Sequence, residues 1–406
     1  MGVIDTPPGL GSALDRRLQA QLDSLRERSL YRVRRAVTGG HAVRMIVDGR
    51  PVLNFCANDY LGLATDARVI EAARRAFAVS GVGSTGSALI SGHNVEHRAL
   101  EDEIADFLGC PRALLFSTGF TTNVGVIKAL LGRGDVVVAD ELNHASLIDG
   151  ARASGAEYLR VPHANVEAYA QALAQAAAQG RDAMLITDGL FSMDGDIADL
   201  PALAALTQAS GAALMVDDAH GFGVLGVGGR GTPDMLGVRP DVHVVTLGKS
   251  LGSAGGIVAG SETLIEYLIQ RARSWVFSTA PPPALAAAAR ESLRILRGEP
   301  EHRARLIANM ARFIDGARER GLPIAERGVA TPIQPVIVGD EDRALALSRG
   351  LMERGYWVAA IRPPTVPRGT ARLRITLSAA HEFAQIDGLL DALRELLGAS
   401  SPAVAA

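Results

Sequence analysis

Short apolar runs alternate with longer segments of helical spacing from about Val52 to Gly260. The runs are RALLFST, DVVVAD, AEYLRV, DAMLITD, AALMVDD and DVHVVTLG, and segments such as GFTTNVGVIKALL and VEAYAQALAQAAAQG separate them. Short buried strands that alternate with helices of about ten or more residues are typical of a parallel sheet covered on both faces. The run GGIVAG (255–260) follows its neighbour too closely for a helical crossover, so we expect it to be antiparallel.

The pattern changes after STAPPP (278–283). A long helical stretch rich in Ala, Arg and Leu leads to the strand-like runs IQPVIVG, YWVAAI and ARLRITL, with helices near 341–354 and at the end of the chain. This mixture predicts a smaller α+β unit. At the other end, residues 12–35 predict a polar amphipathic helix that forms an arm rather than part of the core. We therefore predict a loose tail at 1–10 within an N-terminal arm at 1–51, a large domain at 52–285, a small C-terminal domain at 286–398 and a disordered tail at 399–406.

Composition narrows the class of protein. The chain has 406 residues, 48% apolar and 21% charged, which is typical of a globular protein with more than one core. A net charge of −3 provides no positive electrostatic field to attract nucleic acid. No apolar run approaches the roughly 20 residues that are needed to span a bilayer. Two cysteines, Cys56 and Cys110, and an N-terminus without the apolar centre of a signal peptide favour the cytoplasm.

One lysine stands at a strand end among glycines, in VVTLGKSLGSAGG (244–256). Lys249 and Asp217 each follow an apolar strand, so both should face one crevice at the carboxyl edge of the sheet. A lysine and a buried aspartate there suit pyridoxal 5'-phosphate, because the amine condenses with the aldehyde and the carboxylate pairs with the ring nitrogen. STGFTTN supplies Gly119 and Phe120 at a helix start for the phosphate, and His144 is a candidate lid over the ring.

A second candidate site lies in ARLRITL, where Arg372 and Arg374 share one face of an alternating strand. Burying an unpaired guanidinium is costly, so this face should turn inward only where it meets an anion. The other interpretation is a solvent-facing edge with two ordinary arginines. The neighbouring proline-rich loop, which carries Arg362 and Thr365, favours an anionic substrate.

Other motifs are poor matches to known sites. GVGSTG (81–86) and GFGVLG (221–226) lack the strand before and the helix after that a dinucleotide fingerprint needs, and GKS lacks the P-loop spacing because His243 stands where a glycine should be. In HNVEH, His93 should lie at or before a helix start, as a capping or loop histidine rather than a zinc ligand. VDDAHG (216–221) leaves two interpretations, a metal site or a carboxylate and an imidazole that hold an organic cofactor.

Several stretches together carry a resemblance that covers the chain from the arm to the last helix. They are NFCANDYLGL, LLFSTGFTTN, NHASLIDG, LFSMDGD, MVDDAHGFGVLG, VVTLGKSLG, STAPPP and AIRPPTVPRGTARLRITLSAAHE (360–382). In these the chain resembles the α-oxoamine synthases, a family of fold-type I pyridoxal-phosphate enzymes. The resemblance implies an α/β, aminotransferase-like fold, with a mostly parallel sheet in a large domain, a smaller α+β C-terminal domain, and a homodimer.

The resemblance also implies residue roles. Lys249 corresponds to the lysine that binds the cofactor covalently, Asp217 to the partner of the ring nitrogen, His220 to the histidine at the ring oxygen and His144 to the one stacked on the ring. Further cofactor contacts are Gly119, Phe120, Ser192 and Thr246, with Ser278 and Thr279 reaching the phosphate from the other subunit. Substrate contacts are His144, Arg32, Thr365, Arg374 and Arg362, and no metal is expected. Asp188 stands where relatives often carry glutamate, and the shorter aspartate side chain must reach the same partner. Ala88 stands where several relatives carry a larger polar residue.

Within the family, the stretch 360–382 is most similar to the biotin-pathway members. These imply a decarboxylative condensation of L-alanine with pimeloyl-CoA or pimeloyl-acyl carrier protein, with the released Lys249 as the candidate base. Glycine C-acetyltransferase, or another α-oxoamine synthase, is the alternative enzyme. A non-catalytic partner subunit of the same fold is the alternative outside the enzymes, but it would be expected to lack Lys249.

Overall fold

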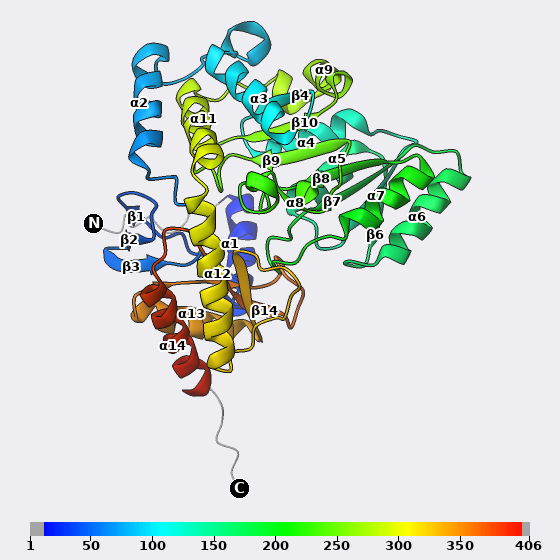
Figure 1. The fold of residues 1–406 in the computed structure, drawn as a ribbon. Coiled ribbons are helices and arrows are strands. Elements are labelled where there is room, and N and C mark those ends of the chain that lie inside the picture. The colour runs from blue at the N-terminus through cyan, green and yellow to red at the C-terminus, as the bar shows by residue number, and fades with distance from the viewer. Residues whose placement is uncertain (1–11, 400–406) are drawn as a thin grey trace.

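The structure is a computed structural model that describes residues 12–399. The predicted tail at 1–10 lies outside the described residues, as does the predicted C-terminal tail from residue 400 onward. A large α/β body forms the upper part of the molecule in Figure 1, and a smaller α+β unit lies below it. Within residues 12–399, no helix combines the length and the apolar character that crossing a bilayer requires.

The large body is built on a seven-stranded sheet of order β4-β10-β9-β8-β7-β5-β6. Its strands are β4 (Arg112–Phe116), β5 (Val136–Asp140), β6 (Glu157–Val161), β7 (Ala183–Asp188), β8 (Ala213–Asp217), β9 (Val242–Thr246) and β10 (Gly256–Gly260). The pairs from β6 through β9 are parallel, whereas β10 runs antiparallel to both β9 and β4. The predicted fold class and the antiparallel exception at β10 are therefore confirmed.

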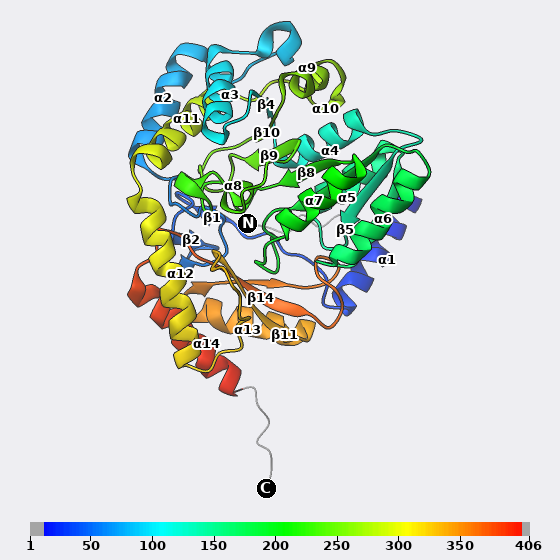
Figure 2. The same cartoon turned by 45° about the vertical axis from the view of Figure 1, so that its right-hand side comes forward.

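Helices cover both faces of this sheet, as Figure 2 shows from the side. They are α3 (Val95–Leu108), α4 (Gly119–Leu130), α5 (Ala145–Ser154), α6 (Val166–Ala178), α7 (Leu200–Ser210) and α9 (Glu262–Arg271). Alternate residues of β5 enter different cores: Val137 packs with α4 and α5, and Val138 packs with α6 and α7. Burial on both faces explains why these strands appear in the sequence as continuous apolar runs.

The smaller unit contains a three-stranded antiparallel sheet of order β11-β14-β13. Its strands and helices are β11 (Ile333–Gly339), β13 (Ala359–Ile361), β14 (Ala371–Thr376), α12 (Glu301–Glu319), α13 (Glu341–Glu353) and α14 (Phe383–Ala399). The long helical stretch predicted before it is two helices, because Pro300 separates α11 (Pro283–Gly298) from α12. α11 packs on α2 (Ala67–Ser80) and α3 of the large body, mainly through small alanines.

The N-terminal segment begins with α1 (Ala13–Glu27), which buries no residue, as expected of an arm. The helix ends earlier than predicted because Ser29 adopts a positive φ of 54°. The next strands, β1 (Val37–Thr38), β2 (Arg44–Val47) and β3 (Arg50–Asn54), were not predicted, and they form a sheet with β12 (Tyr356–Trp357). YWVAAI therefore contributes to two different sheets. The division of the chain into an arm and two domains stays a prediction.

Candidate active site

The carboxyl edge of the seven-stranded sheet gathers the predicted catalytic groups. β7, β8 and β9 end at Asp188, Asp217 and Thr246, and Asp188 lies opposite Asp217 in the register of the two strands. Parallel strands bring their carboxyl ends to one edge, where open α/β sheets bind ligands. The edge faces the smaller unit, whose β14 lies beneath it in Figure 2.

Lys249 lies in a tight turn just after β9. The Gly252 amide donates to the Lys249 carbonyl at 2.9 Å, and the Ser253 amide donates to Leu247. Gly252 has a φ of +59°, and a Cβ there would lie 2.3 Å from the Ala64 nitrogen, so the turn requires glycine. Burial lowers the pKa of Lys249 to about 8, although the charges of Asp217 and Asp188 act in the opposite direction. The amine is therefore available as a nucleophile near neutral pH.

Asp217 is a buried carboxylate, 5% exposed, held by two donors. The Asn123 amide donates to Oδ2 at 2.5 Å and the Ala219 backbone amide donates to Oδ1 at 3.0 Å. Among residues 12–399 it forms no ion pair. A buried carboxylate of this kind is suited to a cationic ligand group that arrives from outside the chain.

Two histidines flank this pair. His144 is the N-cap of α5, and its backbone amide donates to Asp188 Oδ2 at 2.6 Å, so the short aspartate does reach a partner. Burial, followed by repulsion from Asp217, raises the pKa of Asp188 well above its usual range. His220 Nδ1 lies 2.6 Å from the Tyr60 hydroxyl, and burial followed by the charges of Lys249 and Arg374 lowers its pKa well below the ordinary value. The charge of Lys249 contributes to the lowered pKa of both His144 and His220, after burial.

The amino end of α4 closes the site on one side. Thr118 is its N-cap, and the backbone amides in the first turn of a helix suit an anionic group. A Cβ on Gly119 would lie 3.6 Å from the Thr246 side chain, and the Phe120 ring lies edge-on to His144 with centroids 6.5 Å apart. The predicted cofactor contacts Gly119, Phe120 and Thr246 therefore lie next to one another and to His144.

Arg374 enters the site from β14 of the smaller unit. Its Nε donates to the Ser192 carbonyl at 2.6 Å and its Nη2 donates to Asn58 Oδ1 at 3.2 Å. It is 6% exposed and has no carboxylate partner within the described residues, whereas its neighbour Arg372 pairs with Asp194. Both arginines are buried, as expected of a face that meets an anion, and the anion beside Arg372 is the protein's own Asp194.

The remaining predicted contacts lie farther out. Arg32 Nη2 donates to the Thr365 hydroxyl at 3.3 Å, and Arg362 donates to the Ser29 carbonyl, so the arm lies against the proline-rich loop. Ser278 and Thr279 line a small cavity of about 20 Å³ together with Ala88 and Ser117, the residue just before the N-cap of α4. Within one chain, the structure does not bring these two hydroxyls into contact with Lys249.

Comparison with known proteins decides the family. The aminotransferase class I and II family matches residues 50–393. The 8-amino-7-oxononanoate synthase of Methylococcus capsulatus is 54% identical over 377 residues, which is 92% of this chain and 96% of that protein. The chain belongs to the 8-amino-7-oxononanoate synthases. The solved 8-amino-7-oxononanoate synthase of Francisella tularensis superposes with a TM-score of 0.73 at 31% identity, over 86% of this chain and 98% of that one.

Pyridoxal phosphate is the cofactor of these synthases. A solved structure described as SPT with a PLP internal aldimine superposes with a TM-score of 0.90 at 29% identity, over 96% of this chain and 99% of the other. The donor set here fits that group. Lys249 offers an amine of lowered pKa, Asp217 offers a buried carboxylate without an ion-pair partner, and the first turn of α4 offers backbone amides.

The weak motifs have structural explanations that agree with this family of synthases. His97 caps α3, with Nδ1 accepting from the Asn94 amide at 3.1 Å, and His93 precedes that cap, as expected of a capping or loop histidine. In GFGVLG, a Cβ on Gly221 would lie 2.2 Å from Asp218 Oδ1, so the glycine permits close packing of the loop. Across residues 12–399, no group of three or more His, Cys, Asp or Glu could hold a metal ion.

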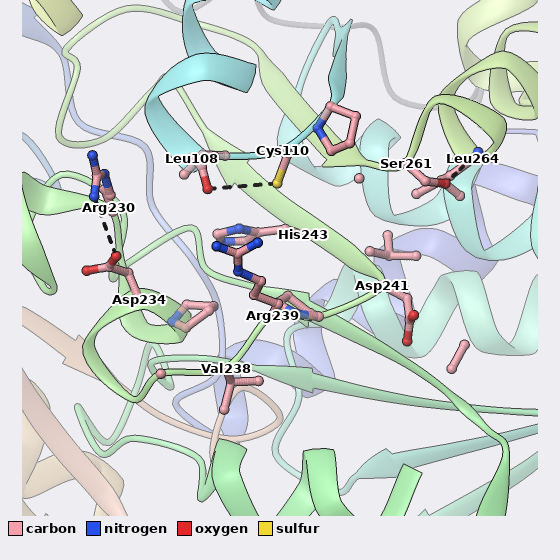
Figure 3. Close-up of a pocket in the computed structure, with 18 of the residues that line it drawn as sticks. Leu108, Cys110, Arg230, Asp234, Val238, Arg239, Asp241, His243, Ser261 and Leu264 are labelled. Atoms are coloured by element: carbon pink, nitrogen blue, oxygen red, sulfur yellow. Dashed lines mark hydrogen bonds and ion pairs between the residues drawn. The ribbon is translucent and has the colours of Figure 1, made fainter. Parts of the chain in front are cut away.

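A cavity of about 850 Å³ lies elsewhere, at the opposite edge of the sheet (Figure 3). Its walls include Arg239, His243 and Cys110, whose side chains point into the cavity in that view. None of the predicted site residues, all of which the structure describes, lines it. Volume alone therefore does not locate the chemistry of these synthases.

The prediction from sequence gave no role to three residues that contact the predicted site. They are Tyr60, which bonds His220, Asn58, which bonds Arg374, and Asn123, which bonds Asp217. All three lie within NFCANDYLGL or LLFSTGFTTN, two of the stretches that carry the family resemblance. Their position in those stretches indicates that they could be functional, but only the fold identifies the residues that they contact.

Proposed function

We propose that this chain joins L-alanine to a pimeloyl thioester and releases CO2, the free thiol carrier and 8-amino-7-oxononanoate, a step of biotin biosynthesis. The names of the relatives support the product. One observation supports the amino-acid site: a buried arginine without a carboxylate partner, Arg374, whose charge is felt by Lys249. Such a guanidinium suits the carboxylate of an amino acid.

Each catalytic group has a task in this proposal. When bound, pyridoxal phosphate supplies an electron sink for the carbanion at the amino acid's Cα. Lys249 Nζ would hold the cofactor and, with a pKa that burial lowers to about 8, would also serve as the base that takes the Cα proton. Asp217 would pair with the ring nitrogen of the bound cofactor. His144 would cover the ring, and His220, whose Nδ1 lies 2.6 Å from the Tyr60 hydroxyl, would bond the ring oxygen.

The acyl donor would enter between the arm and the proline-rich loop. Arg32, Thr365 and Arg362 are the polar groups there, and the arm is tied to the loop through Arg32 and Arg362. The two arginines suit the far carboxylate of a pimeloyl chain or the phosphates of its carrier, and the Thr365 hydroxyl can add a hydrogen bond.

We also propose that the active enzyme is a homodimer in which Ser278 and Thr279 reach the partner's cofactor phosphate. The support is a set of exposed apolar side chains around these hydroxyls. They lie on or beside α2, η1 (Ala88–Gly92) and α10 (Arg273–Val276) and include Val79, Val82, Leu89, Ile90, Val95 and Phe277. Ile90, on η1, is 84% exposed, Phe277, just after α10, is 70% exposed, and η1 and α10 are in contact. Large apolar side chains exposed close together are typical of an interaction surface. A cytoplasmic location also stays a proposal, supported by the free thiols of Cys56 and Cys110.

Substrate competition tests the proposal. Purified holoenzyme should turn over L-alanine with pimeloyl-CoA at least about 100-fold more efficiently than glycine with acetyl-CoA. The reverse preference would favour glycine C-acetyltransferase and would leave the family and the cofactor unchanged. No turnover with any pair, in a protein that holds the cofactor, would favour a non-catalytic subunit.

The amino-acid site is tested separately. Arg374→Ala should raise the dissociation constant of L-alanine, read from the visible spectrum of the holoenzyme, by about 100-fold, because a charged hydrogen-bonded pair is lost. Arg318→Ala, which removes an exposed ion pair with Glu326, is the matched control and should change it less than about twofold. An unchanged alanine affinity in Arg374→Ala would remove Arg374 from the site.

A further inference from the structure

A single loop of the large body meets the smaller unit beside Arg374. The loop comprises residues 191–196, follows β7 and is closed by a bridge between Leu190 and Ile197. Three successive residues of it contact β14: Ser192 accepts from Arg374 Nε at 2.6 Å, and both the Met193 carbonyl and the Asp194 carboxylate accept from Arg372 Nη1. The two inward-facing arginines of β14 therefore hold the same loop.

The two arginines differ in how their charge is met. Arg372 is 3% exposed and pairs with Asp194, and its Nε donates to the carbonyl of Thr370, just before β14. Without Asp194, a buried guanidinium would lack its counter-charge. Within residues 12–399, Arg374 donates to two neutral oxygens, the Ser192 carbonyl and Asn58 Oδ1, and forms no ion pair, so its charge remains available to a ligand. Asp194 thus neutralises one arginine and leaves its neighbour on the strand free.

The other end of the loop is fixed from both sides. His163 lies between Asp140 and Asp196, 2.9 Å from an oxygen of each, which ties the loop to the end of β5. The Thr331 hydroxyl donates to the Gly195 carbonyl at 2.8 Å, and a Cβ on Gly195 would lie 2.3 Å from the Ile333 carbonyl. Arg327 also donates to the Asp194 carbonyl. The Ser192 carbonyl is therefore held in place by contacts from both parts of the molecule.

We propose that Asp194 is a positioning residue for the amino-acid substrate: by anchoring Arg372 and the Ser192 carbonyl, it fixes the orientation of the Arg374 guanidinium toward the substrate carboxylate. The inference rests on the proposed role of Arg374. A guanidinium recognises a carboxylate through a planar fork of donors, so rotation of the fork weakens binding even when the charge is retained. Asp194 itself touches neither substrate nor cofactor.

The test is Asp194→Asn in the holoenzyme, an isosteric change that removes only the charge. The dissociation constant of L-alanine should rise about tenfold, which is the size of coupling expected within one hydrogen-bonded network. The KM for pimeloyl-CoA and the visible absorption of the cofactor should stay the same. If Asp194 had only a structural role, the substitution would lower the Tm and would weaken the binding of both substrates together. Glu326→Gln, which neutralises an exposed ion pair of the smaller unit, is the matched control. If Asp194→Asn does not fold, Asp194→Glu takes its place. This variant keeps the charge on a longer side chain, so the dissociation constant of L-alanine should rise by a smaller factor.

A double-mutant cycle with Arg374→Lys separates this inference from the proposed function. If Asp194 acts through Arg374, the effect of Asp194→Asn on alanine affinity should largely vanish in the Arg374→Lys background. A full effect in that background, or none in the wild-type background, would overturn the inference. If Arg374→Lys alone leaves alanine affinity unchanged, the proposed role of Arg374 fails first, and the inference fails with it.

Discussion

Asp188 and Asp217 lie directly opposite each other on β7 and β8, two buried carboxylates at one edge of the sheet. Burial and the charge of Asp217 raise the pKa of Asp188, so the pair divides its tasks. Asp217 accepts hydrogen bonds from Asn123 and the Ala219 amide, and we propose that it meets the cofactor. Asp188 accepts the His144 amide at 2.6 Å and so fixes the start of α5.

This division predicts unequal effects of two matching substitutions. Asp188→Asn keeps an oxygen for the His144 amide, so turnover should stay within about threefold of wild type. Asp217→Asn should slow the exchange of the alanine Cα proton by at least about 100-fold, because the group that stabilises the developing charge is lost. Deuterium incorporation into alanine, followed by NMR, measures both. Equal losses in the two variants would contradict the assignment.

The lowered pKa of Lys249 predicts how the cofactor attaches. Only the neutral amine attacks an aldehyde, so the rate at which the apoprotein takes up pyridoxal phosphate should rise with pH, with a midpoint near the pKa of about 8. The visible absorption band that appears on attachment measures the rate. Lys249→Ala should bind the cofactor without that band, and borohydride reduction of the wild type should label Lys249. A midpoint near that of an ordinary lysine, or a label on another lysine, would refute the assignment.

The proposed dimer predicts a loss of assembly and activity from one surface change. Ile90→Asp places a charge on one of the most exposed of these apolar side chains and should shift the protein toward monomer in sedimentation velocity. Activity should fall with the dimer fraction, since the phosphate contacts would come from the partner. Ile307→Asp, on an exposed position of α12, is the control and should stay dimeric. A fully active monomeric Ile90→Asp protein would rule out the shared site.

His163 predicts a pH-dependent contribution to stability. Burial opposes its charge, but the hydrogen bonds to Asp140 and Asp196 outweigh burial and raise its pKa to about 10. A pKa raised on folding stabilises the fold fully below the unfolded value, about 6.5, and that stabilisation is lost as the pH rises toward 10. The Tm difference between wild type and His163→Gln should therefore be largest near pH 6 and should shrink by pH 9.5. A difference that grows with pH would contradict the ion pair, and His41→Gln, at an exposed position, serves as the control.

The sequence by itself determined the architecture of the large body and the location of its chemistry. Runs buried on both faces, separated by helix-length segments, leave little choice but a covered parallel sheet. Parallel strands also place their carboxyl ends at one edge, so the positions of Lys249 and Asp217 after apolar strands were enough to bring them together. The alternation of a strand placed Arg372 and Arg374 on one face, and the cost of burying an unpaired guanidinium predicted an anion beside that face.

Only the tertiary structure decided which segments distant in the sequence meet. Periodicity reports which face of an element is buried but not what lies opposite it, so the contacts of Tyr60 with His220 and of Asn58 with Arg374 could not be predicted. The split of YWVAAI between two sheets depends on β3, an element about 300 residues earlier in the chain that the pattern did not predict. The different fates of Arg372 and Arg374 likewise depend on where the 191–196 loop lies, because a carboxylate near one guanidinium and not the other is a property of the packed loop.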